Sequence, residues 1–236
     1  GYHAMMALEH DMIGMAMTNA SPLVAPTHSN ERMLGTNPHC WVFPARQFDP
    51  LVIDLATAAA ANGKLEIAER EGKAMPSGWA VDAQGNPTTD PSILKQGGSL
   101  LPLGSTPEGS SHKGYGLAAV ADLLSGVLSG ANFGPWVPPF VAFLQPPADP
   151  VGQGIGHFVG AMRIDAFRDL DGYYQAIDTW INRFKNASRI DPNQPVLVHG
   201  EPEMKHYRQR KKEGVPLNGK VVADLQDLAN RFKISF

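Results

Sequence analysis

The residue types best suited to chemistry lie together in one short stretch, residues 110–117, with the sequence SSHKGYGL. His112 and Lys113 stand between two serines and a Gly-x-Gly, where an apolar helical pattern begins. Hydroxyl groups, a lysine and the free N–H groups of a helix start together suit an anion. We therefore expect Lys113 to contact an anionic group of a cofactor or substrate. This stretch alone also fits a packed core helix with a solvated lysine at its entrance.

The helix that follows must position these side chains. Its large apolar residues recur at the i, i+3, i+4, i+7 spacing, which predicts one buried face. The opposite positions hold Gly, Ala and Ser, so we expect close packing on both sides of the helix. The residues of the expected buried face are Leu117, Val120, Leu123, Leu124, Val127, Leu128 and Ala131.

Polar side chains also follow two predicted strands. Residues 12–18 form a short apolar run that ends in Thr18 and Asn19, with Ser21 close behind, and pockets are often built at such strand ends. Asp54 closes the apolar run 51–53. An unpaired buried charge is expensive, so we expect Asp54 to be buried and hydrogen-bonded.

The remaining pattern predicts an alternation of strands and helices. Strands are expected at 40–43, 51–56, 157–164 and 196–198, with a small ribbon around 79–82. Helices are expected at the N-terminus, over 171–184, over the charged run 203–213 and after a cap at Asn218. Another helix is expected to start in the alanine run 58–61, with Asn62-Gly63 ending it or turning the chain. The proline-rich stretch 133–150 is expected to be ordered, with Trp136, Phe140 and Phe143 buried.

Composition narrows the class of protein. The 236 residues are 43% apolar and 18% charged, enough for a substantial core. A net charge of −3 argues against a nucleic-acid or polybasic membrane surface, and no apolar run reaches about 18 residues. The single cysteine, Cys40, is expected to be a buried structural thiol rather than a nucleophile, and it fits a reducing, cytoplasmic compartment.

Several common motifs are missing from the sequence. It contains no G-x-G-x-x-G after a strand, no P-loop, no G-x-S-x-G and no H-E-x-x-H. Its eight histidines lack ligand spacing, so we expect no metal.

Four short motifs nevertheless occur in a characteristic order: LGTNP at 34–38, IDLAT at 53–57, HKGYGL at 112–117 and LSGA at 128–131. In this the chain resembles the malate/L-lactate dehydrogenase family of NAD(P)-dependent oxidoreductases. That family also contains ureidoglycolate dehydrogenase, diketogulonate reductase and Δ1-piperideine-2-carboxylate reductase. The resemblance covers essentially the whole chain.

The resemblance implies an α/β fold that is not a Rossmann fold, with a mixed, largely antiparallel sheet flanked by helices. It implies NAD or NADP as cofactor, bound mainly by residues 12–165, and a homodimer with its active site near the subunit interface. By the same analogy, eleven residues would line the cofactor site: Thr18, Asn19, Ser21, Asp54, Leu55, Ala56, Thr57, His112, Lys113, Gly200 and Glu201.

Family members are longer at the N-terminus, where their proton-transferring histidine and substrate-binding arginine lie. In the family these residues lie in Ser-His-Gly and Asn-x-x-His-x-Gly type motifs. Gly1 corresponds to a position just after the second motif, and the first helix starts without a cap. We therefore expect residues 1–236 to be the C-terminal two-thirds of such an enzyme, with the proton donor upstream. His3 and His10 do not match the donor's position, and no catalytic residue is identified in the chain. Were the chain alone active, His112 would be the first candidate.

The resemblance to this family leads to two alternative functions. The first is hydride transfer between a nicotinamide cofactor and a small 2-hydroxy or 2-oxo acid, or a cyclic imino acid, with no nucleic-acid or membrane partner. The alternative is a catalytically silent fragment or paralogue that keeps only the dimer scaffold and nucleotide binding.

Overall fold

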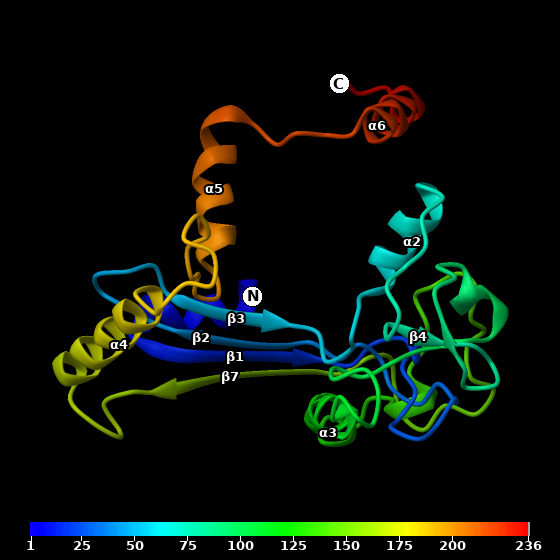
Figure 1. Cartoon of the computed structure of the whole chain (residues 1–236), viewed down its shortest axis with the longest axis horizontal. Helices are drawn as coiled ribbons and strands as arrows, with labels where there is room; N and C mark the ends of the chain where they lie inside the picture. Colours follow the sequence, from blue (N-terminus) through cyan, green and yellow to red (C-terminus); the bar gives the residue numbers. More distant parts are fainter. Residues whose placement is uncertain (236) are drawn as a thin grey trace.

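A four-stranded antiparallel sheet forms the centre of the computed structural model, which describes residues 1–235 (Figure 1). The sheet has the order β3-β2-β1-β7, and each strand runs antiparallel to its neighbours. The strands are β1 (Met12–Thr18), β2 (His39–Phe43), β3 (Leu51–Leu55) and β7 (His157–Arg163). The predicted strands over these regions are confirmed.

The N-terminal helix packs directly on this sheet. It consists of α1 (Tyr2–Met5) and the 3₁₀ helix η1 (Met6–His10). A Cβ on Gly14 of β1 would lie 1.9 Å from the carbonyl oxygen of Ala4, so this close approach requires glycine. Cys40 is buried beneath the helix, as predicted, and burial raises the pKa of its thiol.

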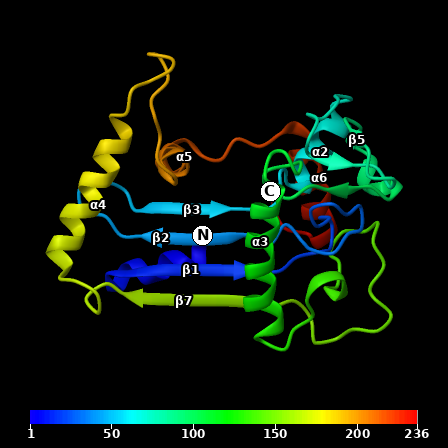
Figure 2. The same cartoon turned by 60° about the horizontal axis from the view of Figure 1, so that its bottom comes forward.

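Helix α3 (Ser111–Asp122) crosses the ends of the strands and continues as the π-helical turn η3 (Leu123–Val127) (Figure 2). Two side chains fasten it to the segment entering β2. Asn37 donates its amide N–H to the carbonyl oxygen of Ala118 at 3.0 Å, and His39 Nε2 lies 2.8 Å from the Leu117 oxygen. The helix start predicted within the stretch 110–117 is confirmed.

The predicted buried face of α3 is wrong for five of its seven residues. Ala131 is buried and Leu124 is half-buried, but the other large apolar residues face solvent, with Leu123 54% and Leu128 69% exposed. The buried side consists of small residues such as Gly114 and Ala118, and a Cβ on Gly114 would lie 2.2 Å from the Leu103 oxygen. Because only small side chains permit so close a backbone approach, the large ones are left outside. This exposed apolar stripe comprises Leu117, Val120, Leu123, Val127 and Leu128.

A smaller sheet, of order β5-β4-β6, lies beyond the strand ends and confirms the predicted ribbon. Its strands are β4 (Ala80–Val81), β5 (Pro87–Thr88) and β6 (Ser99–Leu100). The helix predicted from the alanine run is wrong, because residues 58–61 are not helical and α2 (Asn62–Arg70) begins at the Asn62-Gly63 pair that was expected to end it. The run itself is irregular because the Ala59 N–H donates to the Leu101 oxygen at 2.9 Å.

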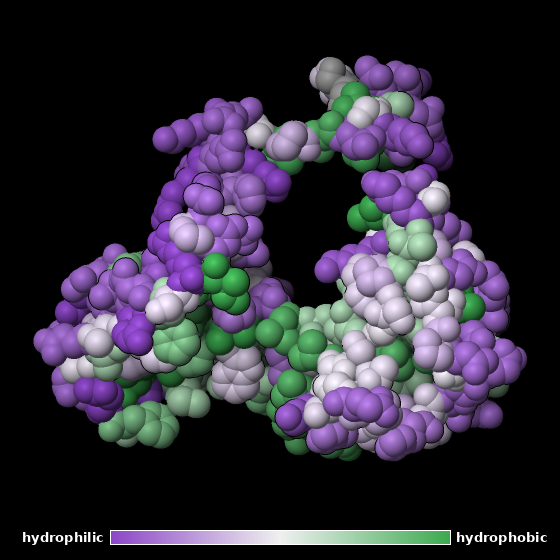
Figure 3. Space-filling view, in the orientation of Figure 1, coloured by the Kyte–Doolittle hydropathy of each residue, from purple (hydrophilic) through white to green (hydrophobic). Residues whose placement is uncertain are grey.

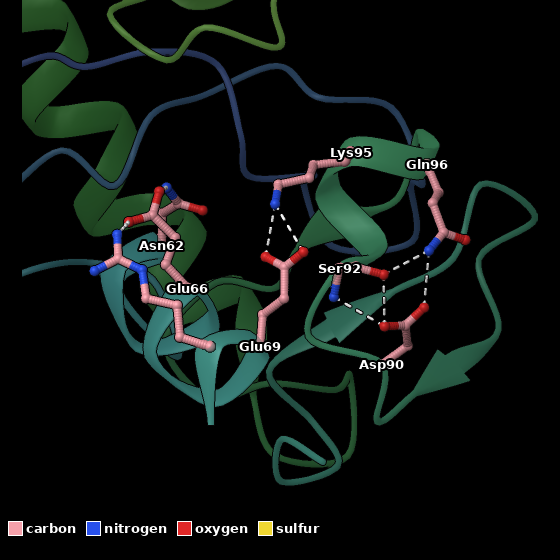
Figure 4. A network of polar contacts seen from close by, with 8 residues as sticks. Asn62, Glu66, Glu69, Asp90, Ser92, Lys95 and Gln96 are labelled. Carbon is pink, nitrogen blue, oxygen red and sulfur yellow. Dashed lines mark hydrogen bonds and ion pairs between the residues drawn. The ribbon is translucent and has the colours of Figure 1, made fainter. Parts of the chain in front are cut away.

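Polar contacts join α2 to the 3₁₀ helix η2 (Ile93–Gln96) beside this small sheet (Figure 4). Lys95 Nζ lies 2.6 and 2.8 Å from the two carboxylate oxygens of Glu69. Asp90 accepts hydrogen bonds from Ser92 and Gln96 at the start and end of η2. These contacts are peripheral and hold the local fold together.

The proline-rich stretch 133–150 is ordered, with one 3₁₀ turn, η4 (Gly134–Trp136). Val137 is fully buried and Phe143 packs against the core. The predicted burial of Trp136 and Phe140 is wrong, because both are exposed and Phe140 is 64% exposed. Three prolines flank these aromatic residues and limit how the backbone can fold back.

Three helices complete the chain. Helix α4 (Leu170–Lys185) lies at one end of the sheet and buries Ile181. Helix α5 (Glu201–Glu213) buries no residue, and its surface is hydrophilic (Figure 3), as predicted for the charged run. Helix α6 (Gly219–Phe232) begins at the predicted cap, where Asn218 accepts a hydrogen bond from the Lys220 N–H at 2.9 Å. Within residues 1–235 no helix is long and apolar enough to cross a membrane.

The strand predicted over residues 196–198 is wrong, because they form no strand. The chain bonds to the sheet just after them, where the Val52 N–H of β3 donates to the His199 oxygen at 3.1 Å. The segment 197–200 before α5, here called the α5 loop, therefore lies along the edge strand.

Candidate active site

Asp54 lies near the end of the edge strand β3, opposite Cys40 in the register of β2. The prediction that it is buried is wrong, because its side chain is 44% exposed. Cys40 on the same face is covered by the N-terminal helix, whereas Asp54 lies beside Gly1, ahead of the first turn of that helix. The amino group of Gly1 donates to Asp54 Oδ2 at 2.5 Å. Asp54 is thus hydrogen-bonded, as predicted, yet accessible.

Two cavities meet at Asp54. The larger, of about 590 Å³, lies between β3, the α5 loop and the first turns of α5. The smaller, of about 470 Å³, extends over the sheet toward β1 and β7 and is lined by Thr18 and His157. Gly1 and Asp54 line both cavities. The carboxylate therefore stands where a ligand spanning the two spaces would pass.

Gly200 fixes the wall of the larger cavity. Its φ is +90°, a conformation that other residues adopt only with strain. A Cβ at this position would also lie 2.9 Å from the Cβ of Val52. Glycine therefore lets the α5 loop approach β3 closely and then turn directly into α5, which starts at Glu201.

Three predicted site residues, Asn19, Ser21 and Thr57, are buried and use their polar atoms within the chain. Asn19 donates to the Asn132 oxygen at 2.7 Å and accepts from the Gly156 N–H at 2.9 Å. Ser21 accepts from a backbone N–H, and Thr57 donates to a backbone carbonyl at 3.0 Å. They hold the ends of β1 and β3 in place, and their part in cofactor binding stays a prediction.

Leu55 and Ala56 continue from Asp54 and are half-buried. His112 and Lys113 are exposed in the first turn of α3, and neither lines the two cavities at Asp54 in the described structure. The hydroxyl of Ser111 lies 3.0 Å from that of Thr27 rather than facing an open anion site. Thr18 and Gly200 therefore each line a cavity that Asp54 also lines, whereas Lys113 lines neither cavity.

The contribution of α5 was missed by sequence reasoning. Met204 and Tyr207 line the larger cavity, although the charged run that contains them reads as a solvated helix. Their i, i+3 spacing places them on one face of the helix and was the available signal. Glu201 lies on another side of α5, where it pairs with Lys185.

Asp122 was also missed. It is buried at the end of α3, where Oδ2 accepts from the Gly134 N–H at 2.7 Å and Oδ1 from the Asn19 amide at 3.3 Å. Burial raises the pKa of this carboxyl, against the opposing effect of the two hydrogen bonds. Among residues 1–235 no three or more His, Cys, Asp or Glu side chains gather as a metal site would require.

Comparison with known proteins gives consistent matches. The family model described as malate/L-lactate dehydrogenase matches residues 1–226. Malate dehydrogenase from Pyrococcus horikoshii is 38% identical over 232 residues, which are 98% of this chain and 62% of that protein. Malate/(S)-sulfolactate dehydrogenase from Methanothermus fervidus is 35% identical, with 99% of this chain and 63% of that protein covered.

Solved structures agree with the sequence matches. The crystal structure of malate dehydrogenase from Entamoeba histolytica superimposes with a TM-score of 0.87 at 28% identity, covering 100% of this chain and 65% of that one. The predicted α/β fold is therefore confirmed. The chain spans a little under two-thirds of the length of these relatives. It belongs to the malate/L-lactate dehydrogenase family.

Proposed function

We propose that this chain forms the cofactor-binding part of an NAD(P)-dependent dehydrogenase that moves hydride between nicotinamide and a small 2-hydroxy or 2-oxo acid. The proposal rests on the position of Asp54, whose accessible carboxylate lies where the two cavities meet. It lies beside the α5 loop, in which Gly200 packs against β3. The cofactor-binding residues are proposed to lie mainly within 12–165, with the α5 loop added from the C-terminal side.

The cavities suit a nicotinamide cofactor in size and chemistry. Each falls within the usual range for ligand pockets, about 300–1,000 Å³. Met5, Val52 and Met204 offer apolar surface for a flat ring, while the Asp54 carboxylate can accept from ribose hydroxyls or a carboxamide. When bound, the cofactor supplies or accepts the hydride; the chain binds and orients it.

The proposed site centres on Asp54 near the end of β3 and on Gly200 across the cavity from it. Leu55 and Ala56 follow Asp54 at the end of the strand, and Glu201 follows Gly200 as the first residue of α5. Thr18 contributes from the second cavity. Buried Asn19, Ser21 and Thr57 hold the strand ends that carry these groups. His112 and Lys113 are proposed to contact anionic groups from the start of α3.

A homodimer is proposed as the assembled state. The exposed apolar stripe of α3 supports it, because adjacent large apolar side chains on a helix surface mark an interaction site. This stripe lies on the same helix as Lys113, so pairing through α3 would bring that lysine close to the interface.

Binding and turnover are tested in sequence. The chain is titrated with NADH and NADPH, with nicotinamide fluorescence as the readout. Loss of NAD(P)H absorbance is then followed with the 2-oxo acids that correspond to malate, lactate and sulfolactate, and with Δ1-piperideine-2-carboxylate. Binding with reduction of one of these supports the proposal. Because the proton donor is expected upstream of Gly1, binding without turnover fits both functions, and turnover restored by adding that upstream segment separates the dehydrogenase from the silent scaffold. No binding of either cofactor contradicts both.

A further inference from the structure

A separate cavity of about 690 Å³ lies between the C-terminal end of α4, the segment after it and the start of α5. We call it the α4–α5 cavity. Leu197 and Pro202 line both this cavity and the larger one at Asp54. The two spaces are therefore neighbours on different sides of the α5 loop. Figure 1 shows α5 rising next to the segment that returns from α4.

The α4–α5 cavity is rich in positive charge. Lys185, Arg189, Lys205 and Arg208 line it, against two carboxylates, Asp49 and Glu201. Both carboxylates are already paired: Lys185 with Glu201, and Arg208 with Asp49. Four cations against two anions leave an excess of two positive charges.

Arg189 and Lys205 supply the two excess positive charges of the α4–α5 cavity. Arg189 Nη1 donates to the Pro192 carbonyl oxygen at 3.2 Å, and within residues 1–235 neither side chain forms an ion pair. They come from different segments, one after α4 and one on α5, and meet at one concave space. A guanidinium is suited to bidentate contact with phosphate oxygens, and an ammonium adds a compact second charge.

We propose that the α4–α5 cavity binds a phosphate monoester through Arg189 and Lys205. A phosphate monoester carries about −1.5 to −2 charges at neutral pH, which matches the unpaired excess better than a single carboxylate does. The group could belong to the 2′-phosphate of NADPH or to a separate phosphorylated small molecule. Binding of a phosphate here does not depend on the proposed dehydrogenase function.

The test uses inorganic phosphate as the probe and isothermal titration calorimetry as the readout. The variant Arg189→Ala/Lys205→Ala removes both unpaired cations. The control, Arg210→Ala/Lys212→Ala, removes one arginine and one lysine from α5 outside this cavity, so the net charge changes equally. All four residues are exposed, and thermal unfolding verifies that both variants fold.

We expect phosphate to bind the unmodified chain and the control equally, and the cavity variant at least tenfold more weakly. No measurable binding to the unmodified chain would overturn the proposal. Equal weakening in the two variants would also overturn it, since it would mean that only the overall charge matters.

Titrations with NADPH and NADH identify the source of the phosphate. If it belongs to the cofactor, the cavity variant loses affinity for NADPH and keeps its affinity for NADH. If it belongs to a separate molecule, the variant binds both cofactors normally, and phosphate binds the unmodified chain in the presence of NADPH.

Discussion

The Val52 N–H donates to the His199 carbonyl oxygen at 3.1 Å, which joins the edge strand β3 to the α5 loop. These residues come from distant parts of the sequence, and this bond sets the wall opposite Asp54. A cofactor site at Asp54 therefore depends on a contact between the sheet and the C-terminal part of the chain.

Replacing Gly200 with alanine should move the α5 loop away from β3. The new Cβ would lie 2.9 Å from the Val52 Cβ, at a residue with φ of +90°. We expect NADH affinity to fall tenfold or more, or about 1.4 kcal/mol. Fluorescence titration provides the measurement.

Gly214→Ala is the matched control for this change. Gly214 follows α5 with φ of +85°, but nothing lies within 4 Å of its added Cβ. It therefore adds backbone strain of about 1–3 kcal/mol at another glycine of positive φ, without the steric clash. Similar NADH affinities for the two variants would show that the close approach at Gly200 is unimportant.

Asp122 should give the protein a specific pH dependence of stability. Burial raises the pKa of its carboxyl in the folded chain above the ordinary 3.8. Between those two pKa values the folded state binds more protons than the unfolded state, so the contribution of Asp122 to the free energy of unfolding falls as pH rises. Asp122→Asn cannot titrate. The stability of the unmodified chain relative to this variant should therefore decrease as pH rises from about 3.8.

Urea unfolding at a series of pH values measures this difference. Asp149→Asn, at an exposed position in the proline-rich stretch, serves as the control and should not share the trend. A relative stability that stays constant, or that increases with pH, would mean that Asp122 does not titrate as described.

The exposed stripe on α3 should mediate self-association. Leu123 is 54% exposed among other apolar residues, and a glutamate there would place a charge in the proposed dimer contact. We expect sedimentation velocity to show a dimer for the unmodified chain and a monomer for Leu123→Glu. Ile67→Glu, at an exposed apolar residue of α2, should remain dimeric. A dimer that survives Leu123→Glu would place the interface elsewhere.

Local patterns were sufficient to predict the strands of the central sheet and helices α4, α5 and α6. Their signals lie within the elements themselves: the apolar runs of β1 and β3, the periodicity of α4 and the cap at Asn218. The family resemblance predicted that Asp54 and Gly200 line one cofactor site, and the structure places both at the same cavity.

The structural features that could not be predicted from the sequence depend on contacts between segments that are far apart in the chain. The α3 face was misassigned because Gly114 packs on Leu103, which reverses the usual rule that the larger residues point inward. The helix predicted from the alanine run does not form there because the Ala59 N–H donates a hydrogen bond to the Leu101 carbonyl oxygen. Asp54 was expected inside because an apolar run precedes it, but an edge strand covers such a residue only partly.

The central claim, that Asp54 holds a nicotinamide cofactor, is tested most directly by an NADH titration of Asp54→Asn beside the unmodified chain. The substitution keeps the size of the side chain and removes its charge, and Asp149→Asn controls for the loss of one carboxylate. A charge-assisted hydrogen bond contributes about 1.5–3 kcal/mol, reduced here because the carboxylate is partly exposed. We predict that the NADH Kd rises at least fivefold in Asp54→Asn and is unchanged in Asp149→Asn. An unchanged Kd in Asp54→Asn would contradict the account.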